Sequence, residues 1–270
     1  MSIAWTEQVL PVNGIDLHVT QAGTGEPLLM IHGVTVDATF EHHEIEQLAD
    51  TYHVIAPDMR GHGRSTRPAA FTLRDHVEDM IGLLDTLGVQ RTLVLGASMG
   101  SYIAQALTLA IPDRVSKLIL VVAKAHGASS SSARILAEHA DELRGMSREE
   151  QQRWLNARMF APQTPAAVRQ HVLDWIAARQ GLGLDMTAGQ LQAANNAVLD
   201  FDFGGQLPDL DVETLVISGR HDILNPPEEG QQIARLLPHA HLQVFEHSGH
   251  LLSWEEPDHY VDAIRTFLHE

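Results

Sequence analysis

Short runs of consecutive apolar residues alternate along much of the chain with longer segments of helical periodicity. A continuous apolar run is typical of a strand that is buried on both faces, as the strands of parallel sheets are. Strands that alternate with helices in this way predict a mostly parallel sheet covered by helices on both faces, an α/β fold. The predicted buried strands are residues 27–31, 52–56, 92–95, 115–122, 214–217 and 241–245, and the predicted helices are residues 72–87, 99–111, 227–237 and 257–268.

The first residues instead predict an antiparallel hairpin. Residues 8–12 and 15–19 alternate, or nearly alternate, between apolar and polar positions, as half-buried strands do. Asn13 and Gly14 join the two runs, and this dipeptide is the strongest short signal for a tight hairpin turn. We therefore expect two paired strands ahead of the strand–helix alternation.

The alternation of strands and helices breaks between about residues 124 and 205. This stretch contains no convincing strand, and residues 147–150, Ser-Arg-Glu-Glu, form the capping pattern that opens a helix. The four serines of residues 129–132 are interpreted as a flexible hinge. We therefore expect an α/β core domain of residues 1–123 and 206–270, with residues 124–205 inserted as a helical cap.

Charge and composition exclude several classes of partner and site but do not change the predicted fold. The formal net charge is -17 and the sequence pI is about 5.3, so the phosphates of a nucleic acid and an anionic membrane surface would be repelled. The chain has no cysteine, which excludes disulfides, thiolate chemistry and cysteine-ligated metals and fits a reducing cytoplasm. The N-terminus lacks a secretory signal pattern, and the longest apolar run, residues 118–123, is too short to span a bilayer. We expect a cytoplasmic protein with no nucleic-acid or membrane partner.

Residues 96–100, Gly-Ala-Ser-Met-Gly, match the G-x-S-x-G pattern of a nucleophile elbow. The pattern alone is of modest specificity, but here it follows a predicted buried strand and opens a predicted helix, which is the setting that the motif requires. The flanking glycines allow a tight turn that exposes the Ser98 hydroxyl, and the helix N-terminus favours developing negative charge. Ser98 is therefore the candidate nucleophile, the alternative being a glycine-rich turn without catalysis.

A serine hydroxyl needs a base to remove its proton, and 17 histidines compete for that role. His250 lies in a loop after the last predicted strand and before the last helix, and it is favoured over its neighbour His247. Asp222 follows the predicted strand 214–217, and open α/β sheets place their sites at the carboxyl ends of strands. A buried Asp222 would hold the imidazole in the tautomer that accepts the serine proton. The alternative for Asp222 is a turn aspartate that caps a helix.

The oxyanion of an acyl-transfer intermediate requires hydrogen-bond donors near the nucleophile. His32, Gly33 and Val34 follow the predicted strand 27–31, so this backbone is expected to turn across the mouth of the sheet. The backbone amides of Val34 and Met99 are the predicted donors. His32 is expected to hydrogen-bond the loop rather than to serve as a second base.

Together these motifs resemble those of the α/β-hydrolase superfamily over nearly the whole chain. Ser98, Asp222 and His250 follow the family's order of nucleophile, acid and histidine. The closest resemblance within the superfamily is to the branch that contains 3-oxoadipate enol-lactonases, small carboxylesterases and cofactor-free perhydrolases. Ser101 stands where many relatives carry a second glycine, which is expected to alter packing only. The matching stretches are His32-Gly33, residues 58–65, Gly96 to Gly100, Gly219 to Asp222, and Gly249-His250 followed by Glu255 or Glu256 and Pro257.

The resemblance implies a serine hydrolase that cleaves a carboxylic ester or lactone of a small molecule through an acyl-enzyme, without a cofactor. A serine in the elbow argues against haloalkane dehalogenases and epoxide hydrolases, which use aspartate there. Two alternatives on the same fold stay open: a small-molecule receptor or regulatory protein with vestigial or single-turnover hydrolysis, and an acyltransferase or perhydrolase. The oligomeric state is also open, with a homodimer as one alternative.

Substrate identity is expected to depend on the inserted cap. Apolar walls there would favour a moderately apolar acyl or alcohol group. The net negative charge gives no reason to expect a strongly anionic substrate. The candidate pocket walls, each with a simple core residue as the alternative, are Met99, His126, Trp154, Phe160 and Trp175.

Two other patterns resemble binding motifs but are assigned to structure. Residues 61–63, Gly-His-Gly, begin like a dinucleotide-binding loop, but Thr66 stands where the third glycine is required. Residues 41–44, Glu-His-His-Glu, could suggest a metal, yet they do not match the H-E-x-x-H pattern of a zinc helix. The first is interpreted as a connecting loop and the second as a solvated helix start, so no metal site is predicted.

Overall fold

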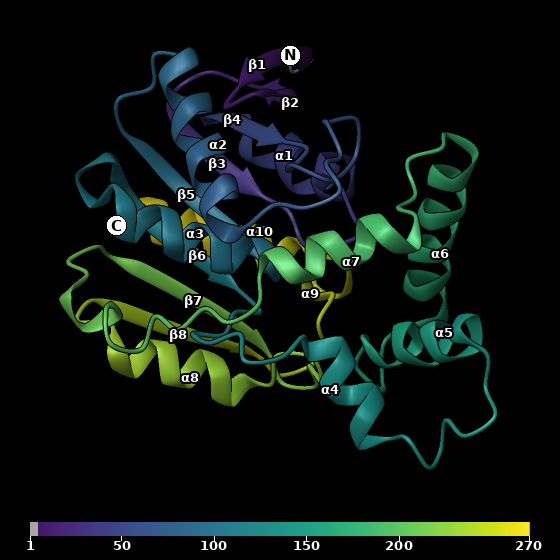
Figure 1. Cartoon of the computed structure of the whole chain (residues 1–270). Helices are drawn as coiled ribbons and strands as arrows, with labels where there is room; N and C mark the ends of the chain where they lie inside the picture. Colours follow the sequence, from purple (N-terminus) through teal and green to yellow (C-terminus); the bar gives the residue numbers. More distant parts are fainter. Residues whose placement is uncertain (1–4, 270) are drawn as a thin grey trace.

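The computed structural model describes residues 5–269, except for the side chains of residues 180 and 181. The described residues are built around one eight-stranded sheet (Figure 1). The strands are β1 (Trp5–Val12), β2 (Ile15–Ala22), β3 (Glu26–Ile31), β4 (Tyr52–Pro57), β5 (Thr92–Ala97), β6 (Val115–Val121), β7 (Thr214–Gly219) and β8 (Ala240–Phe245). Their order in the sheet is β1-β2-β4-β3-β5-β6-β7-β8. The β1–β2 and β2–β4 pairs are antiparallel and the other pairs are parallel, which confirms the predicted α/β class.

Helices pack on both faces of this sheet. The helices α2, α3 and α8 contribute to one apolar cluster, and α1 and α10 contribute to the cluster on the other face. The long helices are α1 (His42–Leu48), α2 (Leu73–Thr86), α3 (Met99–Ala110), α4 (Ser131–Glu138), α5 (Arg148–Arg158), α6 (Ala166–Gly181), α7 (Ala188–Ala197), α8 (Pro227–Leu236) and α10 (Pro257–His269). The short ones are η1 (Ala38–Glu41), η2 (Pro112–Arg114), η3 (Leu207–Asp209) and α9 (Leu252–Glu255).

The continuous apolar runs are explained by these two clusters. Side chains alternate between the faces of a strand, so a strand that is covered on both sides needs apolar residues at every position. In β3, Leu29 and Ile31 join the cluster with α2, α3 and α8, whereas Leu28 and Met30 join the cluster with α1 and α10. All four side chains are almost completely buried.

The predicted elements of the core are present. Each predicted buried strand and helix begins and ends within two residues of the corresponding end of the observed element. The hairpin is confirmed as well, because Val12 pairs with Ile15 across the turn. Asn13 and Gly14 have φ values of 45 and 77 degrees, as a tight hairpin turn requires.

Four helices, α4 to α7, occupy the chain between β6 and β7, and Figure 1 shows them in teal to green on one side of the sheet. Ser147 and Glu150 form the predicted capping box at the start of α5. The hinge expected at the four serines of residues 129–132 stays a prediction. Ser130 caps α4, and Ser131 Oγ donates to Asn225 Oδ1 at 2.7 Å.

The strand order reverses at β3, and the carboxyl ends of the parallel strands lie at one edge of the sheet. From β3 the chain moves to β4 on one side of the sheet, and later strands are added on the other side through β5. Ligands of open α/β sheets bind at the carboxyl ends of the strands beside such a reversal. The loops that follow β3, β5, β7 and β8 carry His32, Ser98, Asp222 and His250, respectively.

Candidate active site

Ser98 lies in the sharp turn between β5 and α3. Its φ is 53 and its ψ is -116 degrees, a backbone conformation that residues other than glycine rarely adopt. The two flanking glycines permit this turn, because a Cβ on Gly96 would lie 2.3 Å from Gly100 O, and one on Gly100 would lie 1.9 Å from Ile31 O. Ser98 N also donates to Val121 O at 2.9 Å. The turn therefore holds the Ser98 side chain at the carboxyl edge of the sheet.

His250, in the loop between β8 and α9, is hydrogen-bonded to Ser98. Its Nε2 lies 3.0 Å from Ser98 Oγ, and its Nδ1 lies 2.7 Å from Asp222 Oδ2. Nδ1 donates to the carboxylate, so Nε2 is left to accept the serine proton. The His250 amide donates to Met159 O of the helical segment at 2.7 Å. The alternative base, His247, is exposed to solvent and lies outside this chain of hydrogen bonds.

Asp222 is buried in the loop after β7, and its two carboxylate oxygens have separate partners. Oδ2 accepts from His250, whereas Oδ1 accepts from the amides of Leu224 and Asn225 at 2.8 and 3.1 Å. The two amides fix the plane of the carboxylate. Its second oxygen therefore stays directed at the imidazole, as an orienting acid requires.

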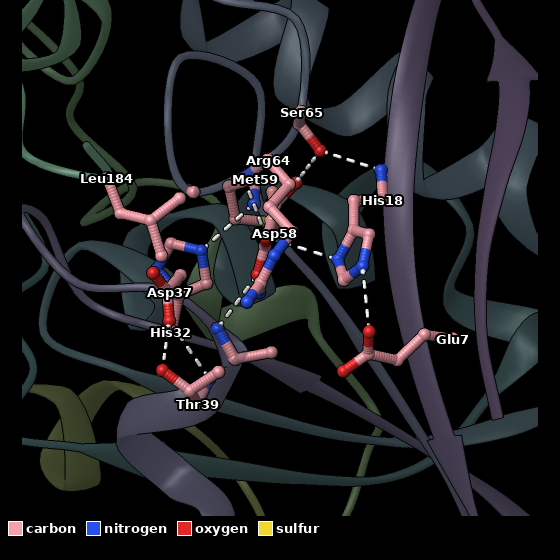
Figure 2. Close-up of polar contacts among 12 residues, drawn as sticks. Glu7, His18, His32, Asp37, Thr39, Asp58, Met59, Arg64, Ser65 and Leu184 are labelled. Carbon is pink, nitrogen blue, oxygen red and sulfur yellow. Dashed lines mark hydrogen bonds and ion pairs between the residues drawn. The ribbon is translucent and has the colours of Figure 1, made fainter. Parts of the chain in front are cut away.

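The loop after β3 brings Gly33 and Val34 beside Ser98. A Cβ on Gly33 would lie 3.5 Å from Ser98 Cβ, so the backbone passes close to the serine. His32 Nε2 accepts from Met59 N at 2.9 Å, and His32 Nδ1 therefore carries the hydrogen that it donates to Gly33 O at 2.7 Å (Figure 2). Gly33 O and the Val34 amide belong to one planar peptide group. His32 thus fixes the direction of that amide, in the loop role expected for it.

Burial keeps His32 in the form that this arrangement needs. Its side chain is fully buried, and the loss of hydration lowers its pKa, although its bond to Gly33 and the nearby carboxylates oppose the shift. Only a neutral imidazole can donate through one nitrogen and accept through the other. Within residues 5–269, the amides of Val34 and Met99 donate to no protein acceptor. The role of the two amides as oxyanion donors stays a prediction.

Asp58, at the end of β4, supports the same loop (Figure 2). Its Oδ1 accepts from Ala38 N at 3.0 Å, and its Oδ2 accepts from Arg64 N at 2.8 Å and lies 3.2 Å from His18 Nδ1. Burial opposes the ionisation of Asp58, but His18 and the two amides outweigh it and hold the pKa of Asp58 below its usual value. The contact with Asp58 in turn raises the pKa of His18. A buried negative charge therefore anchors the start of η1.

Two of the predicted pocket walls lie near the loops of the site. Phe160 is buried and directly follows Met159, whose carbonyl accepts the His250 amide. Trp175 of α6 packs against Phe40, with 4.8 Å between the ring centroids and an angle of 70 degrees between the planes. Phe40 belongs to η1, which continues the loop after β3. The role of Phe160 and Trp175 in binding stays a prediction.

The other predicted walls have different surroundings. His126 is about half exposed, and its Nε2 lies 3.4 Å from a carboxylate oxygen of Glu229 on α8. Trp154 donates to Glu142 at 2.7 Å and packs in an apolar cluster that joins the helical segment to Leu224 of the Asp222 loop. The Met99 side chain is buried in the main core and is not a pocket wall. None of these contacts includes Ser98 or His250.

Several residues that support the site were missed by the sequence analysis. Asn225 is almost fully buried, and its side chain donates to Tyr102 Oη at 2.8 Å and to Val122 O at 2.6 Å. It thereby ties the Asp222 loop to α3 and to the end of β6. Arg179 of α6 is buried against Asp37 of the loop after β3. Neither residue belongs to a periodic pattern, and the only available signal was the position of Asn225 three residues after the acid.

Residues 41–44 are not the solvated helix start that the sequence predicted. The Glu41 and Glu44 side chains are buried, with exposed fractions of 6% and 3%. Burial raises the pKa of Glu41 to about 8 and that of Glu44 to about 7. In the described part of the chain, no group of three or more potential metal ligands is assembled. No helix there is long and apolar enough to cross a membrane.

The chain is similar to hydrolases along nearly its whole length. A family model described as "alpha/beta hydrolase fold" matches residues 26–257. A 2-hydroxy-6-oxononadienedioate/2-hydroxy-6-oxononatrienedioate hydrolase of Pseudomonas putida is 30% identical over 266 residues, which cover 94% of this chain and 92% of that one. A thermophilic esterase from Thermogutta terrifontis is 29% identical, with a TM-score of 0.81 over 98% of both chains. An enol-lactonase from Burkholderia xenovorans shares the fold, with a TM-score of 0.83 at 23% identity over 97% of this chain and 100% of that one. The chain therefore belongs to the α/β-hydrolase fold family.

Proposed function

We propose that this protein is a serine hydrolase that cleaves a carboxylic ester or lactone of a small molecule. The observation that carries the proposal is the continuous hydrogen-bonded chain from Ser98 through His250 to Asp222. A serine that is held in a strained turn and bonded to a buried imidazole is poised for nucleophilic attack. The similarity to an esterase of 29% identity supports ester chemistry for this site.

The proposed reaction is two-step acyl transfer. Ser98 Oγ attacks the carbonyl carbon while His250 Nε2 takes its proton, and Asp222 stabilises the imidazolium that forms. The amides of Val34 and Met99 donate to the oxyanion. His250 then protonates the leaving alkoxide and activates the water that releases the acid. No step requires a metal or an organic cofactor.

We also propose that residues 124–205 form a cap on a core of residues 1–123 and 206–270. The support is that α4 to α7 are consecutive and that Met159 contacts the His250 loop. Phe160 and Trp175 are the aromatic residues of this cap that lie near the loops of the site. They are the proposed walls for an apolar acyl or alcohol group.

The proposal is tested by the hydrolysis of p-nitrophenyl esters of increasing acyl length and of aliphatic lactones. Ser98→Ala removes the nucleophile, and we expect kcat to fall at least about 10,000-fold, as when the nucleophilic serine of other triads is removed. Ser101→Ala is the matched control, because the Ser101 hydroxyl only donates to Ser98 O from the same helix. This control should keep activity within a few fold. Near-normal turnover by Ser98→Ala would overturn the assignment.

The time course separates the alternatives on the same fold. Multiple turnovers establish a hydrolase. A single burst equal to the enzyme concentration favours a receptor or a protein with single-turnover hydrolysis. A rate of acyl release that rises with an added alcohol, amine or hydrogen peroxide favours a transferase or perhydrolase.

A second candidate is suggested by the names of the relatives. Four similar proteins of 28% to 30% identity are named hydrolases of 2-hydroxy-6-oxononadienedioate, a dicarboxylate with a ketone and no ester. Binding two carboxylates favours free cations in the pocket. Three arginines of the proposed cap, Arg134, Arg169 and Arg179, already donate to protein oxygens, which favours the ester or lactone. Faster turnover of that dienedioate than of every ester and lactone would reverse this preference.

A further inference from the structure

The helical segment reaches three separate loops of the site through polar contacts. Arg134 of α4 donates to the Ile223 and Leu224 carbonyls in the Asp222 loop at 3.1 Å. Met159 O, after α5, accepts the His250 amide. The third contact is made by Arg179 of α6 with the loop after β3. Only this third contact joins two oppositely charged side chains that are both buried.

Arg179 holds the loop after β3 at two points. Its Nε and Nη2 donate to Asp37 Oδ2 at 3.0 and 2.8 Å, and its Nη1 donates to Thr35 O at 2.8 Å. The side chains of Arg179 and Asp37 are 7% and 0% exposed. Asp37 uses its other oxygen to accept from Thr39 N at 3.0 Å (Figure 2). The guanidinium thus fixes both the start of η1 and the backbone that leads into it.

The backbone that Arg179 holds is strained. Thr35 has a φ of 69 degrees, although it is β-branched, and such residues rarely adopt this conformation because their side chain crowds the backbone. The residue before it is Val34, whose amide is the proposed oxyanion donor. A strained conformation persists only where the surrounding contacts impose it. His32 holds the peptide before Val34, and Arg179 holds the carbonyl of Thr35 just after it.

We propose that Arg179 is a positioning residue that makes the cap a structural part of the oxyanion hole. The inference rests on the proposed function of Ser98 and of the Val34 amide. Arg179 crosses from the cap to the loop, and its planar fork satisfies Asp37 and Thr35 O together, which a lysine ammonium on a single stem does not reproduce. Without it, Thr35 is free to leave the strained conformation, and the Val34 amide turns away from the oxyanion.

Arg179→Gln is the main test, with Arg67→Gln as the matched control. Arg67 donates to the Leu184 carbonyl in the turn after α6, as Arg179 does, but its other bonds go to Gly63 and Asp185. Asp37→Asn in combination with Arg179→Gln removes the buried carboxylate that the single variant leaves unpaired. All variants are assayed with a short p-nitrophenyl ester, well below their melting temperatures. Each concentration comes from titration of Ser98 with a fluorophosphonate.

We expect kcat to fall about 10- to 100-fold in Arg179→Gln and in the double variant, with KM within about threefold of the wild type, because the oxyanion forms only in the transition state. Arg179→Lys should recover part of kcat, and Arg67→Gln should retain the wild-type values. A merely structural role would lower the melting temperature and leave kcat per titrated site unchanged. That outcome would overturn the proposal.

A second measurement is independent of any substrate. Hydrogen–deuterium exchange of residues 33–41 should be faster in Arg179→Gln than in Arg67→Gln. Equal exchange in the two variants would overturn the positioning role. If the wild type hydrolyses no ester or lactone, the proposed function fails, whereas faster exchange in Arg179→Gln would still establish the contact as the restraint on this loop.

Discussion

The sheet and the helical segment of residues 124–205 are held in place by different forces. In the sheet, alternate residues of each strand fill two large apolar clusters. The helical segment contributes to a smaller cluster around Trp154. Leu173 of α6 is half exposed, and Leu182, just after α6, is 66% exposed. The contacts of the helical segment with the loops of the site combine hydrogen bonds, such as those of Arg179, with apolar packing, such as that of Trp175 on Phe40. The sheet therefore depends mainly on side-chain volume, whereas the junction with the helices depends on polar partners as well.

Ionisable groups differ between the two regions in the same way. Among the described residues, the large pKa shifts of Glu41, Glu44, His62 and His76 all belong to the region of the sheet, where burial is their main cause. In the helical segment, hydrogen bonds lower the pKa of the exposed Glu142 and Glu150. Acid and base should therefore act on stability mainly through the sheet and the loops around it.

The largest expected effect comes from adding one methyl group to each region. Gly100→Ala should destabilise the protein by about 3 kcal/mol or more, since the new Cβ would lie 1.9 Å from Ile31 O. Gly189→Ala in α7 is the control, because its Cβ meets nothing within 4 Å, and it should leave stability unchanged or raise it by up to about 1 kcal/mol. Chemical denaturation measures both effects. Equal destabilisation by the two variants would contradict the expected difference between the two regions.

The next effect is acid sensitivity through His76. Neither ring nitrogen of His76 has a protein partner within residues 5–269, and burial lowers its pKa from 6.5 to about 3. Below pH 6.5 His76 binds a proton in the unfolded chain but stays neutral in the folded protein. Stability is therefore lost as the pH falls from 6.5 toward 3. His76→Leu should reduce this loss of stability at low pH. The exposed His247→Gln is the control, and a pH profile of melting temperature for His76→Leu parallel to the wild type would refute the prediction.

The smallest effect has the opposite sign and involves Glu41. Burial raises its pKa from 4.5 to about 8, so the unfolded chain releases a proton that the folded protein keeps, and stability is lost as the pH rises from 4.5 to 8. Glu41→Gln should therefore raise the melting temperature at pH 8 relative to the wild type by more than at pH 4. Glu46→Gln, which changes an exposed residue of α1, should show no such difference. If Glu41→Gln raised the melting temperature equally at pH 4 and pH 8, the protonation of Glu41 would not be the cause of the pH dependence.

The core elements and the candidate triad were predictable because their constraints are local. A strand that is buried on both faces must be apolar throughout, and residues 27–31 show this directly. The turn at Ser98 tolerates no side chain at Gly96 or Gly100, so the two glycines of the motif indicate a tight turn. His250 could be preferred over His247 from its place in the chain, and the structure places His250 at Ser98.

Other features could not be predicted because they depend on which distant segments meet. Glu41 and Glu44 look like solvated residues in the sequence, and only the packing around α1 buries them. The helix start at residues 130–131 was not predicted either, and Ser131 there donates to Asn225 in a loop 94 positions away. His126 and Trp154 were chosen for their side-chain type, but contacts with Glu229 and Glu142 decide where they point.

The order of strands and helices, the hairpin at Asn13-Gly14 and the turn at Ser98 follow from the sequence, because hydrophobic periodicity and glycine sterics act between near neighbours in the chain. The partners of the polar groups depend on the folded structure, including the bond of Arg179 to Asp37 across 142 positions. Such a contact has no period and no composition signal. It exists because packing brings helix α6 and the loop after β3 together in a buried place, where each charge requires a partner.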